Sequence, residues 1–547
     1  MLTHVYTCAT KDKMKTDIEI ALSVKLKHIE DIAGRLHIPL RHIISYGSYI
    51  AKINSALLKN PARKKDGKLI LVTSMSPTPA GEGKTTITIG LAQSLRLLNK
   101  KAIACIRQPS LGPFFGAKGG ATGSGQSQVL PVEDITMHFT GDDHAVVSAH
   151  NLIASIIDNH LYHGNKLRIN PDRILWKRVS DINDRALRKV KVGFGGKIER
   201  IDEFHISAAS EIMSILCLSQ NLMDLKQRVE NILVAFDNNS RPVFVKDLKI
   251  QGAVTALLRN AIHPNIVQSV EGAPVFVHGG PFGNVSLGCS SLIATKTALR
   301  LADYVITEAG FATELGAEKF FDIKCRVGDL HPSLAVIVAT LNALRLHSFK
   351  NLERHVENIR KFGIPLLVAI NRYEKDTDEE LNEIINLLEN KDIPAFVTDV
   401  RNKGGKGGID IAEKIIELCR QKNKFHYLYP LDMSVEEKII TIAKEMYGAD
   451  KVIFSKEAEG DVKVLEDIGY KNLPVCIAKT PHSLSDNPSL TGRPNGFDIT
   501  VQRVMPAVGA GFLAALCGKI LLMPGFPEHP IAERIYLDDE GNLKFLP

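Results

Sequence analysis

The sequence predicts an α/β fold in which a parallel sheet is wrapped by helices and smaller α/β domains are attached. Three observations lead to this expectation. Strand-like runs alternate with amphipathic helical segments over most of the 547 residues, which is the pattern of a parallel sheet. Several of these runs are apolar throughout, as strands covered on both faces must be. One of them, at 69–75, leads directly into a glycine-rich turn with a lysine and threonines.

The expected elements follow in chain order. The first 60 residues predict helices, because apolar residues recur at three-to-four spacing within 18–36. Strands are expected at 69–75, 101–106, 273–280, 302–310, 364–372, 393–400 and 473–480. Helices are expected at 85–100, 378–391 and 434–448.

A chain of 547 residues is too long for one hydrophobic core. We expect one seam near 347–358, where a charged helix leads into a new run of strands, and another near 422–432. The predicted domains are therefore a large α/β domain at 1–350 that carries the glycine-rich turn, a second α/β domain at 351–430, and a C-terminal α/β domain at 431–547.

The charge balance favours small anionic partners over nucleic acid. The 68 basic and 61 acidic residues leave a net charge of +7, and the basic residues form no concentrated block of the kind that nucleic-acid binding requires. Small anionic substrates are the expectation, with no nucleic-acid partner.

Cysteine usage and apolar patterning favour a cytoplasmic protein. None of the eight cysteines falls in a C-x-x-C pair, which fits a reducing compartment. The first residues show no apolar run followed by a small-residue cleavage site, so secretion is not expected. The most apolar stretch, 504–526, is interrupted by proline, glycines and Lys519, so we expect it to be buried in protein and expect no membrane partner.

The segment TPAGEGKTT at 78–86 predicts a phosphate-binding loop. Between a strand and a helix, small residues free backbone N–H groups to converge on phosphate oxygens, while the lysine reaches the terminal phosphates and the hydroxyl holds magnesium. Thr78 replaces the first glycine of G-x-x-x-x-G-K-[ST], and a plain surface turn is the alternative. We therefore predict a P-loop NTPase-like sheet, with Thr78, Pro79, Ala80, Gly81, Glu82, Gly83, Lys84, Thr85 and Thr86 at the nucleotide.

A second glycine-rich segment, 106–131, follows the next strand. A nucleotide-driven switch has no need of it, whereas a transferase that folds backbone around a second anionic substrate does. Arg107 ends the strand, where its planar guanidinium can hold a carboxylate or an acyl phosphate. A solvated or salt-bridged arginine is the alternative.

The sequence resembles the formate–tetrahydrofolate ligase family, also called 10-formyltetrahydrofolate synthetases. The resemblance rests on motifs that span nearly the whole chain in the family's order. They are TPAGEGKTT, RQPSLGPFFGAKGGATGSGQSQVLP, MHFTGDDHAVVSAHNLIASIIDNHL, WKRVSDINDRALR, VHGGPFGNVSLGCSS, ADYVITEAGFATELGAEKFFDIKCR, LSDNPSLTGRPNGF and GAGFLAALCGKILLMPGFP.

The resemblance implies an ATP-dependent ligation of formate to tetrahydrofolate that gives 10-formyltetrahydrofolate, ADP and phosphate. Formate is a poor acylating agent, so its oxygen is first phosphorylated to formyl phosphate, which N10 of the folate then attacks. Lys84, Arg107 and Mg²⁺ on Thr85 would offset the repulsion between the two anions, with Lys84 and Arg107 as catalytic residues. A monovalent cation, a homotetramer and a folate site shared with the domain at 351–430 are also implied.

The resemblance further implies a folate-stacking pair, of which one member differs here. Tyr373 follows V-A-I-N-R as the family's first aromatic residue does, but Arg401 stands where the family carries a tryptophan before K-G-G-x-G-G. A guanidinium can stack on a heterocycle, and weaker folate binding is the alternative. Gln108, where bacterial members have glutamate, is a milder change, and 343–355 lacks a glycine-containing insertion.

Two further sets of polar residues are candidates for a metal site. Five histidines lie near Asp142 and Asp143 in the sequence: His138, His144, His150, His160 and His163. The spacing of these histidines suits no zinc ligand set. We therefore expect the two aspartates to cap the following helix. Glu308 ends a strand and is a candidate magnesium ligand, with a structural cap as the alternative. Trp176 is expected to pack in the core.

Two rival functions remain open at the level of sequence. One is a P-loop ATPase of the partitioning or metal-delivery type, which would not need the second glycine-rich loop. The other is a non-catalytic relative that binds nucleotide as a scaffold. Lys84 and Arg107 argue against the scaffold, whereas Arg401 keeps it open.

Overall fold

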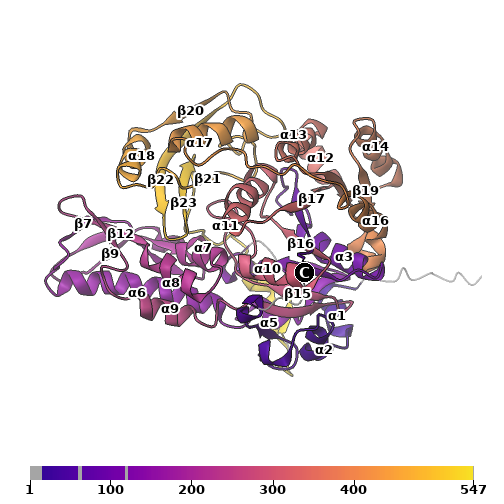
Figure 1. Cartoon of the computed structure of the whole chain (residues 1–547), viewed down its shortest axis with the longest axis horizontal. Coiled ribbons are helices and arrows are strands. Elements are labelled where there is room, and N and C mark those ends of the chain that lie inside the picture. The colour runs from indigo at the N-terminus through magenta and orange to yellow at the C-terminus, as the bar shows by residue number, and fades with distance from the viewer. Residues whose placement is uncertain (1–14, 60–64, 117–120, 542, 546–547) are drawn as a thin grey trace, which may run out of the picture.

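A computed structural model describes residues 15–59, 65–116, 121–541 and 543–545. Its centre is a 12-stranded sheet whose main path runs β1-β2-β14-β15-β4-β16-β3-β17-β18-β19. From β15 to β19 along this path every neighbouring pair is parallel (Figure 1). The parallel strands are Pro274–Val277 (β15), Ala102–Ile106 (β4), Tyr304–Glu308 (β16), Lys68–Ser74 (β3), Pro332–Ala339 (β17), Leu366–Asn371 (β18) and Ala395–Thr398 (β19). The predicted fold class is confirmed.

The apolar strands are buried on both faces, as their composition requires. In β3, Leu69 and Leu71 pack into one hydrophobic core, whereas Ile70 and Val72 pack into another on the opposite face. Helices Lys84–Leu97 (α3) and Ile409–Leu418 (α16) complete the second core, and Leu292–Leu301 (α10) and Phe349–Arg360 (α13) contribute to the first. All seven predicted strands are present, but β17, between β3 and β18, was not predicted.

The N-terminal region is only partly helical, contrary to the prediction. The expected helix at 18–36 is split into Asp17–Ser23 (α1) and Ile29–Gly34 (α2). Ile43–Ser45 (β1) and Ala51–Ile53 (β2) then form an antiparallel pair, and β2 pairs with Asn265–Ser269 (β14) at the edge of the large sheet. The isoleucines of this segment are β-branched residues that suit strands, and an open sheet edge is available to them.

Two smaller parts adjoin the sheet. One carries the antiparallel strands Ile169–Ile174 (β7), Leu233–Asp237 (β12) and Pro242–Phe244 (β13), with the helices Asp142–Tyr162 (α6), Leu222–Glu230 (α8) and Gln251–Leu258 (α9) (Figure 1). The other, near the C-terminus, is a four-stranded sheet of order β20-β22-β23-β21, made of Lys451–Phe454, Asp498–Ala507, Phe512–Cys517 and Val475–Ala478. Lys456–Asp467 (α18) and Val435–Ile442 (α17) accompany it.

The remaining elements are short. Further helices are Leu111–Phe115 (α4), Val132–Thr136 (α5), Glu211–Leu218 (α7), Arg326–Gly328 (α11), Leu341–His347 (α12), Asp378–Glu389 (α14) and Val400–Lys403 (α15). Further strands are Gly123–Ser124 (β5), Ser127–Leu130 (β6), Arg178–Ser180 (β8), Val190–Val192 (β9), Arg200–Asp202 (β10), Phe204–Ile206 (β11), Ile535–Leu537 (β24) and Leu543–Phe545 (β25). The 3-10 helices are η1 (Leu40–His42), η2 (Ser55–Lys59), η3 (Arg185–Arg188), η4 (Ser207–Ala209), η7 (Gly404–Gly408) and η9 (Ile531–Arg534); the π-helices are η5 (Thr313–Ala317), η6 (Phe320–Cys325) and η8 (Ala443–Tyr447).

The predicted ranges 351–430 and 431–547 contribute strands to different sheets. β18 and β19, from the predicted range 351–430, continue the same sheet as β3 and β17. The four-stranded sheet draws its strands from 431–547. The apolar stretch at 504–526 contributes the end of β22 and all of β23, whose inward residues are buried. The part 504–517 is thus buried or half-buried in protein, as expected, whereas Lys519 and Leu521 are exposed.

Two findings bear on the cysteine and membrane predictions. The seven cysteines of the described ranges are all buried, and none of them forms a disulfide. Within the same ranges, the helices are all too short or too polar to cross a lipid bilayer. Cys8 lies outside the described residues.

Three of the five histidines, His144, His150 and His160, lie in helix α6. His150 bonds Ser210 Oγ through Nδ1 (2.8 Å) and the Lys177 carbonyl through Nε2 (2.9 Å), and it stacks on Trp176 with ring centroids 4.0 Å apart. Both ring nitrogens are therefore already bonded. Trp176 is 5% exposed, as the packing prediction requires, and the described residues contain no metal-ligand cluster of three His, Cys, Asp or Glu.

The prediction that Asp142 and Asp143 cap α6 is wrong. The N-cap is Gly141, whose φ of 81° places it in the left-handed region, and Asp142 is the first helical residue. Asp142 Oδ1 instead lies 2.7 Å from Lys52 Nζ, in a buried ion pair with β2. Asp143 accepts a hydrogen bond from Ser207 Oγ (3.2 Å). Local sequence spacing could not predict the ion pair between Asp142 and Lys52, because β2 is remote in sequence.

Acid is expected to destabilise the fold through His150. Burial lowers the pKa of His150 to about 3 from 6.5, so below pH 6.5 the unfolded chain binds a proton that the folded chain excludes. The stability from this group is complete above pH 6.5 and falls as the pH decreases toward 3. The His150→Gln variant keeps an amide donor for the Lys177 carbonyl. Its urea midpoint should fall less than the wild-type midpoint between pH 7.5 and 5, and an equal fall would contradict the assignment.

Candidate active site

The predicted catalytic residues lie together at one edge of the central sheet. Strands β4, β16 and β3 are parallel neighbours, so their carboxyl ends lie side by side. Arg107 follows β4, Glu308 ends β16, and the phosphate loop with Lys84 follows β3. This edge is where open parallel sheets place their ligands.

The phosphate loop occupies 75–83, between β3 and α3. Gly81 and Gly83 adopt φ values of 82° and 75°, and Gly83 is the N-cap of α3. No described side chain caps this helix, so the first-turn N–H groups are directed toward the loop, where a helix N-terminus favours an anion. Lys84 Nζ donates to Ser74 Oγ at the end of β3 (3.1 Å). The loop therefore has the local geometry of a phosphate cradle.

Glu82 braces the loop from inside. The residue is 1% exposed, and its carboxylate accepts hydrogen bonds from the Thr78 backbone N–H (2.6 Å) and from Thr340 Oγ1 at the start of α12. Asn371 Nδ2, at the end of β18, donates to the Glu82 carbonyl (3.2 Å). A buried carboxylate with these bonds holds the loop in one conformation, because each unmade bond would leave a buried polar group unsatisfied.

Thr85, Glu308 and Arg107 form one contiguous polar group. Thr85 Oγ1 donates to Glu308 Oε2 at 2.6 Å, and Arg107 Nε lies 3.5 Å from Glu308 Oε1. Glu308 is 1% exposed, whereas the Arg107 side chain is 24% exposed. Arg107 Nη1 also donates to the Pro281 carbonyl (3.4 Å) in a glycine-rich turn. A carboxylate and a hydroxyl in contact offer hard oxygen donors, and the arginine adds a positive charge beside them.

The second glycine-rich segment lies against the phosphate loop, as far as it is described. Ser124 Oγ and Thr86 Oγ1 are 3.0 Å apart, and the Gln108 backbone N–H donates to the Gly279 carbonyl (2.8 Å). A Cβ at Gly125 would stand 2.1 Å from the Arg401 carbonyl, so glycine permits this close approach. Residues 117–120 of the predicted segment lie outside the described residues.

Tyr373 and Arg401 both flank this edge. The Tyr373 hydroxyl donates to the Gly81 carbonyl (3.4 Å), and burial followed by the nearby Glu82 charge raises the Tyr373 pKa above 10.0. The Arg401 side chain is 41% exposed, and its guanidinium lies 3.6 Å from Asp17 Oδ1 of helix α1. The Arg401 carbonyl accepts from the Gln126 backbone N–H (2.7 Å). Arg401 therefore joins α1 to the second glycine-rich segment.

Four residues of this edge were not identified from the sequence. Ser74, Thr340 and Asn371 follow or end the buried strands β3, β17 and β18, and Asp17 begins α1. The signal for the first three is a polar residue at the end of an apolar strand, where neighbouring carboxyl ends meet. Asp17 carries no comparable signal, because its position depends on how α1 packs.

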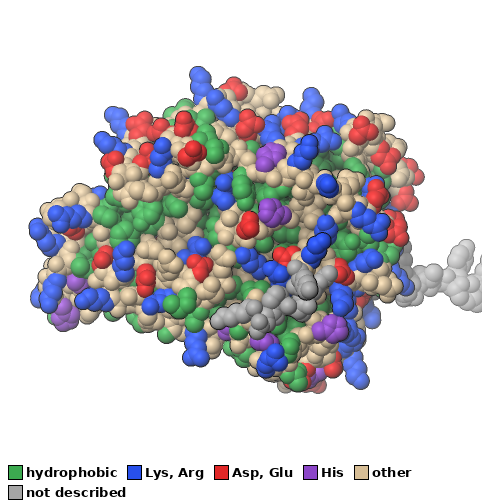
Figure 2. All heavy atoms as spheres, in the orientation of Figure 1, with side chains coloured by type: hydrophobic (Ala, Val, Ile, Leu, Met, Phe, Trp, Pro, Cys, Tyr) green, Lys and Arg blue, Asp and Glu red, His purple; other side chains and the backbone are tan. Residues whose placement is uncertain are grey.

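A cavity of about 810 Å³ lies elsewhere, between the region of β7 and β12 and the C-terminal sheet. Its walls include Trp176, Phe236, Arg503 and Met505, and a band of apolar side chains is visible between these regions in Figure 2. None of the predicted nucleotide or folate residues is among the described residues that line it. The catalytic candidates therefore gather outside this cavity.

A parallel sheet with a glycine-rich loop between a buried strand and the N-terminus of a helix defines the class of P-loop nucleotide-binding α/β proteins. Within that class, the model of the formate–tetrahydrofolate ligase family matches residues 15–546. The chain belongs to this family, whose members are ATP-dependent ligases of formate and tetrahydrofolate. The resemblance drawn from the motifs is confirmed.

Two solved structures also match, both of plasmid partition proteins from Borrelia burgdorferi. Each has 13% sequence identity and covers 65% of this chain and 98% of its own; the TM-scores are 0.23 and 0.22. One of the two was solved with AMPPNP bound. Scores this low support no argument about function.

The two left-handed glycines of the phosphate loop should differ in their tolerance of a side chain. A Cβ at Gly83 would stand 2.5 Å from Asn371 Nδ2, whereas at Gly81 it would meet no described atom within 4 Å. Both alanine variants incur a backbone cost of about 1 kcal/mol, but Gly83→Ala must also displace Asn371 from Glu82. We expect Gly83→Ala to weaken ATP binding at least about tenfold more than Gly81→Ala, measured by calorimetry. Equal losses would show that Asn371 does not hold the loop.

Proposed function

We propose that the chain joins formate to tetrahydrofolate through formyl phosphate, giving 10-formyltetrahydrofolate, ADP and phosphate. The observation that carries the proposal is the convergence of Lys84, Arg107 and the Thr85–Glu308 pair at the ends of adjacent strands. Family membership supplies formate, ATP and tetrahydrofolate as the reactants. The partition-type ATPase and the nucleotide-binding scaffold gain no support from this geometry.

The chemistry proceeds in two displacements. A formate oxygen attacks the γ-phosphorus of ATP, the bond to the bridging oxygen breaks, and ADP leaves with formyl phosphate formed. N10 of the folate then attacks the formyl carbon, loses its proton, and phosphate leaves with the oxygen that came from formate. Lys84 and the loop N–H groups would bind the transferred phosphoryl group, and Arg107 would hold formate and then formyl phosphate.

Thr85 and Glu308 are the residues that would hold Mg²⁺. Their oxygens are in contact at 2.6 Å, and one carboxylate and one hydroxyl, completed by phosphate oxygens and water, are the donors that Mg²⁺ takes in nucleotide sites. Bound there, the ion would neutralise charge on the phosphates. The resemblance also implies a monovalent cation, to which we assign no residue.

Tyr373 and Arg401 would bind the folate beside the phosphate loop. Tyr373 reaches Gly81, and the positive charge of Arg401 offsets part of the rise in the Tyr373 pKa that burial and Glu82 cause, so the two side chains share one electrostatic environment. The guanidinium plane of Arg401 can stack on a pterin in the role of an aromatic ring. Its pairing with Asp17 would keep that plane in place.

Assembly as a homotetramer and a cytoplasmic location complete the proposal. The tetramer follows from the family resemblance. The buried, unpaired state of all seven described cysteines supports a reducing compartment.

Isotope transfer tests the intermediate directly. With ¹⁸O-labelled formate, one labelled oxygen should appear in the phosphate product, because the mixed anhydride breaks at its formyl carbon. ADP release should also require both formate and tetrahydrofolate. Unlabelled phosphate would exclude formyl phosphate, and ADP release that ignores both co-substrates would favour an ATPase.

The Arg107→Ala variant should lose formate-dependent turnover by about a hundredfold or more, the scale for removing one charge-stabilising group. ATP binding should stay within about threefold of wild type, because Lys84 and the loop amides remain. Equilibrium binding and initial rates separate the two effects. Should ATP binding be lost as well, Arg107 would serve the nucleotide and not formate.

The Arg401→Ala variant should raise the KM for tetrahydrofolate by about tenfold while leaving kcat and the KM for ATP near wild type. Lys403→Ala is the matched control, since Lys403 lies on the same short helix but pairs with Asp399. Equal KM values for the two variants would remove Arg401 from the folate site.

A further inference from the structure

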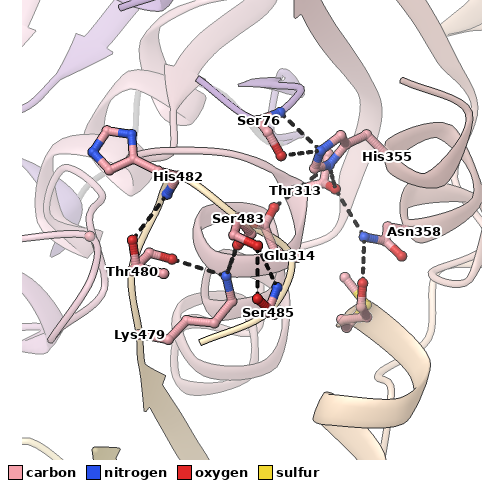
Figure 3. Close-up of polar contacts among 12 residues, drawn as sticks. Ser76, Thr313, Glu314, His355, Asn358, Lys479, Thr480, His482, Ser483 and Ser485 are labelled. Carbon is pink, nitrogen blue, oxygen red and sulfur yellow. Dashed lines mark hydrogen bonds and ion pairs between the residues drawn. The ribbon is translucent and has the colours of Figure 1, made fainter. Parts of the chain in front are cut away.

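The segment 480–493, here named the C-terminal loop, joins β21 to β22 and is folded around one buried lysine. Lys479 Nζ donates to the Thr480 carbonyl (3.0 Å) and to the Ser483 carbonyl, and Ser483 Oγ donates to the Leu490 carbonyl (2.5 Å). Lys479 is fully buried. Figure 3 shows this lysine beneath the loop, directed toward its backbone. The loop is therefore an ordered element of the C-terminal part.

Two side chains of the central part contact the C-terminal loop and the phosphate loop at once. Asn351 Nδ2 donates to the Gly492 carbonyl (2.7 Å) and to Ser76 Oγ (3.0 Å). His347 accepts from the Gly492 backbone N–H at Nδ1 (3.3 Å) and bonds the Pro77 carbonyl through Nε2 (3.3 Å). Ser76 and Pro77 belong to the phosphate loop, so Asn351 and His347 each bridge Gly492 to that loop.

These contacts fix the protonation of two histidines. The Gly492 N–H must donate, so His347 Nδ1 accepts and Nε2 carries the proton given to the Pro77 carbonyl. The Ser76 N–H donates to His355 Nε2 (2.9 Å), so His355 donates from Nδ1 to Thr313 Oγ1 (2.7 Å). Burial lowers the pKa of both imidazoles, so both are neutral at pH 7 and each is bonded on both sides.

The buried carboxyl group of Glu314 continues the connection on the other side of His355. Glu314 Oε2 lies 3.6 Å from His355 Nδ1, and Glu314 Oε1 lies 3.6 Å from Lys479 Nζ. All three side chains are fully buried, and Figure 3 labels their positions. Glu314 is six residues beyond Glu308 on one continuous segment. The candidate active site and the lysine that folds the C-terminal loop are thus connected through buried polar contacts.

We propose that the C-terminal loop positions the phosphate loop, with Asn351 and His347 as the positioning residues that transmit its position to Ser76 and Pro77. Displacing Gly492 would leave buried donors and acceptors of both side chains unpaired, which is energetically unfavourable. The phosphate loop is thereby held in a nucleotide-ready conformation from outside its own domain. This inference rests on the proposed binding of ATP at that loop.

The connection must act in both directions. If the C-terminal loop favours the conformation that binds ATP, then ATP must favour the ordered C-terminal loop by the same factor. Hydrogen exchange of the backbone N–H groups at 480–493 should therefore slow when ATP and Mg²⁺ are added without formate or folate. A purely structural contact would not respond to nucleotide in this way.

An arginine pair allows a test that spares the core. Arg493 pairs with Glu357 of α13 through both guanidinium nitrogens (2.8 and 2.9 Å), whereas Arg503 pairs with Asp461 inside the C-terminal part (2.7 and 3.1 Å). Both pairs are partly exposed, so alanine variants should fold. We expect Arg493→Ala to raise the dissociation constant for ATP about three- to tenfold and to abolish the exchange response, while Arg503→Ala changes neither.

A second pair of variants probes the buried contact itself. Asn351→Asp keeps an acceptor for the Ser76 N–H but loses the donor to the Gly492 carbonyl and to Ser76 Oγ. Asn358→Asp, two turns further on α13, loses the donor to the Met446 carbonyl (2.9 Å) and to Thr313 Oγ1 (3.2 Å), and neither partner belongs to the C-terminal loop or the phosphate loop. Both asparagines are fully buried. Asn351→Asp should raise the ATP dissociation constant and KM at least about tenfold, with kcat changed less than threefold. Asn358→Asp should lose as much thermal stability as Asn351→Asp does, but it should keep the wild-type affinity for ATP.

The outcomes separate this inference from the proposed function. Wild-type protein that binds no ATP would overturn the proposed function. The positioning role alone would be overturned if wild-type protein binds ATP and Arg493→Ala and Arg503→Ala bind it with equal affinity. It would also be overturned if wild-type protein binds ATP and hydrogen exchange at 480–493 does not change when ATP is added.

Discussion

Strand register between β4, β16 and β3 is the constraint on which the candidate active site depends. Glu308 of β16 pairs with Val72 of β3, and Thr307 pairs with Cys105 of β4, so Glu308 reaches Thr85 on one side and Arg107 on the other. A shift of one residue in β16 would turn the Glu308 side chain to the opposite face of the sheet. The apolar residues that alternate between the two cores prevent that shift, because it would exchange the contents of both cores. Packing energy thereby fixes the geometry of a polar site.

The phosphate loop is held by groups that do not face a ligand. Glu82 is buried beneath it, and Thr340 and Asn371 reach it from the ends of β17 and β18. Such a loop needs little reorganisation when an anion arrives, which is how preorganised donors stabilise charge. The energetic cost is a buried carboxylate, which hydrogen bonds from the Thr78 backbone N–H and Thr340 Oγ1 offset. The same principle extends outward to Ser76 and Pro77, where neutral histidines and one asparagine bond the backbone.

Arg401 shows how a single changed side chain alters the relations among distant segments. Its guanidinium pairs with Asp17, and Asp17 Oδ1 also accepts from the Gly125 backbone N–H (3.0 Å). Helix α1, the second glycine-rich segment and α15 therefore meet at one charged group. An aromatic ring at this position would pack by its apolar face, whereas an arginine needs a counter-charge. This edge of the sheet is consequently more polar than a pair of aromatic rings would make it.

Local sequence determined the parallel sheet, the phosphate loop and the strand-end positions of Arg107 and Glu308, because strands covered on both faces must be continuously apolar and because glycines that permit left-handed backbone are visible in the chain. It also determined the family, through motifs spread over nearly its whole length. Only the tertiary structure decided that 43–53 joins the sheet edge, that Asp142 pairs with Lys52, and that Gly492 meets Ser76 through Asn351. These contacts join residues that are remote in sequence. The local sequence around a polar side chain does not predict which remote residue will be its hydrogen-bond or ion-pair partner.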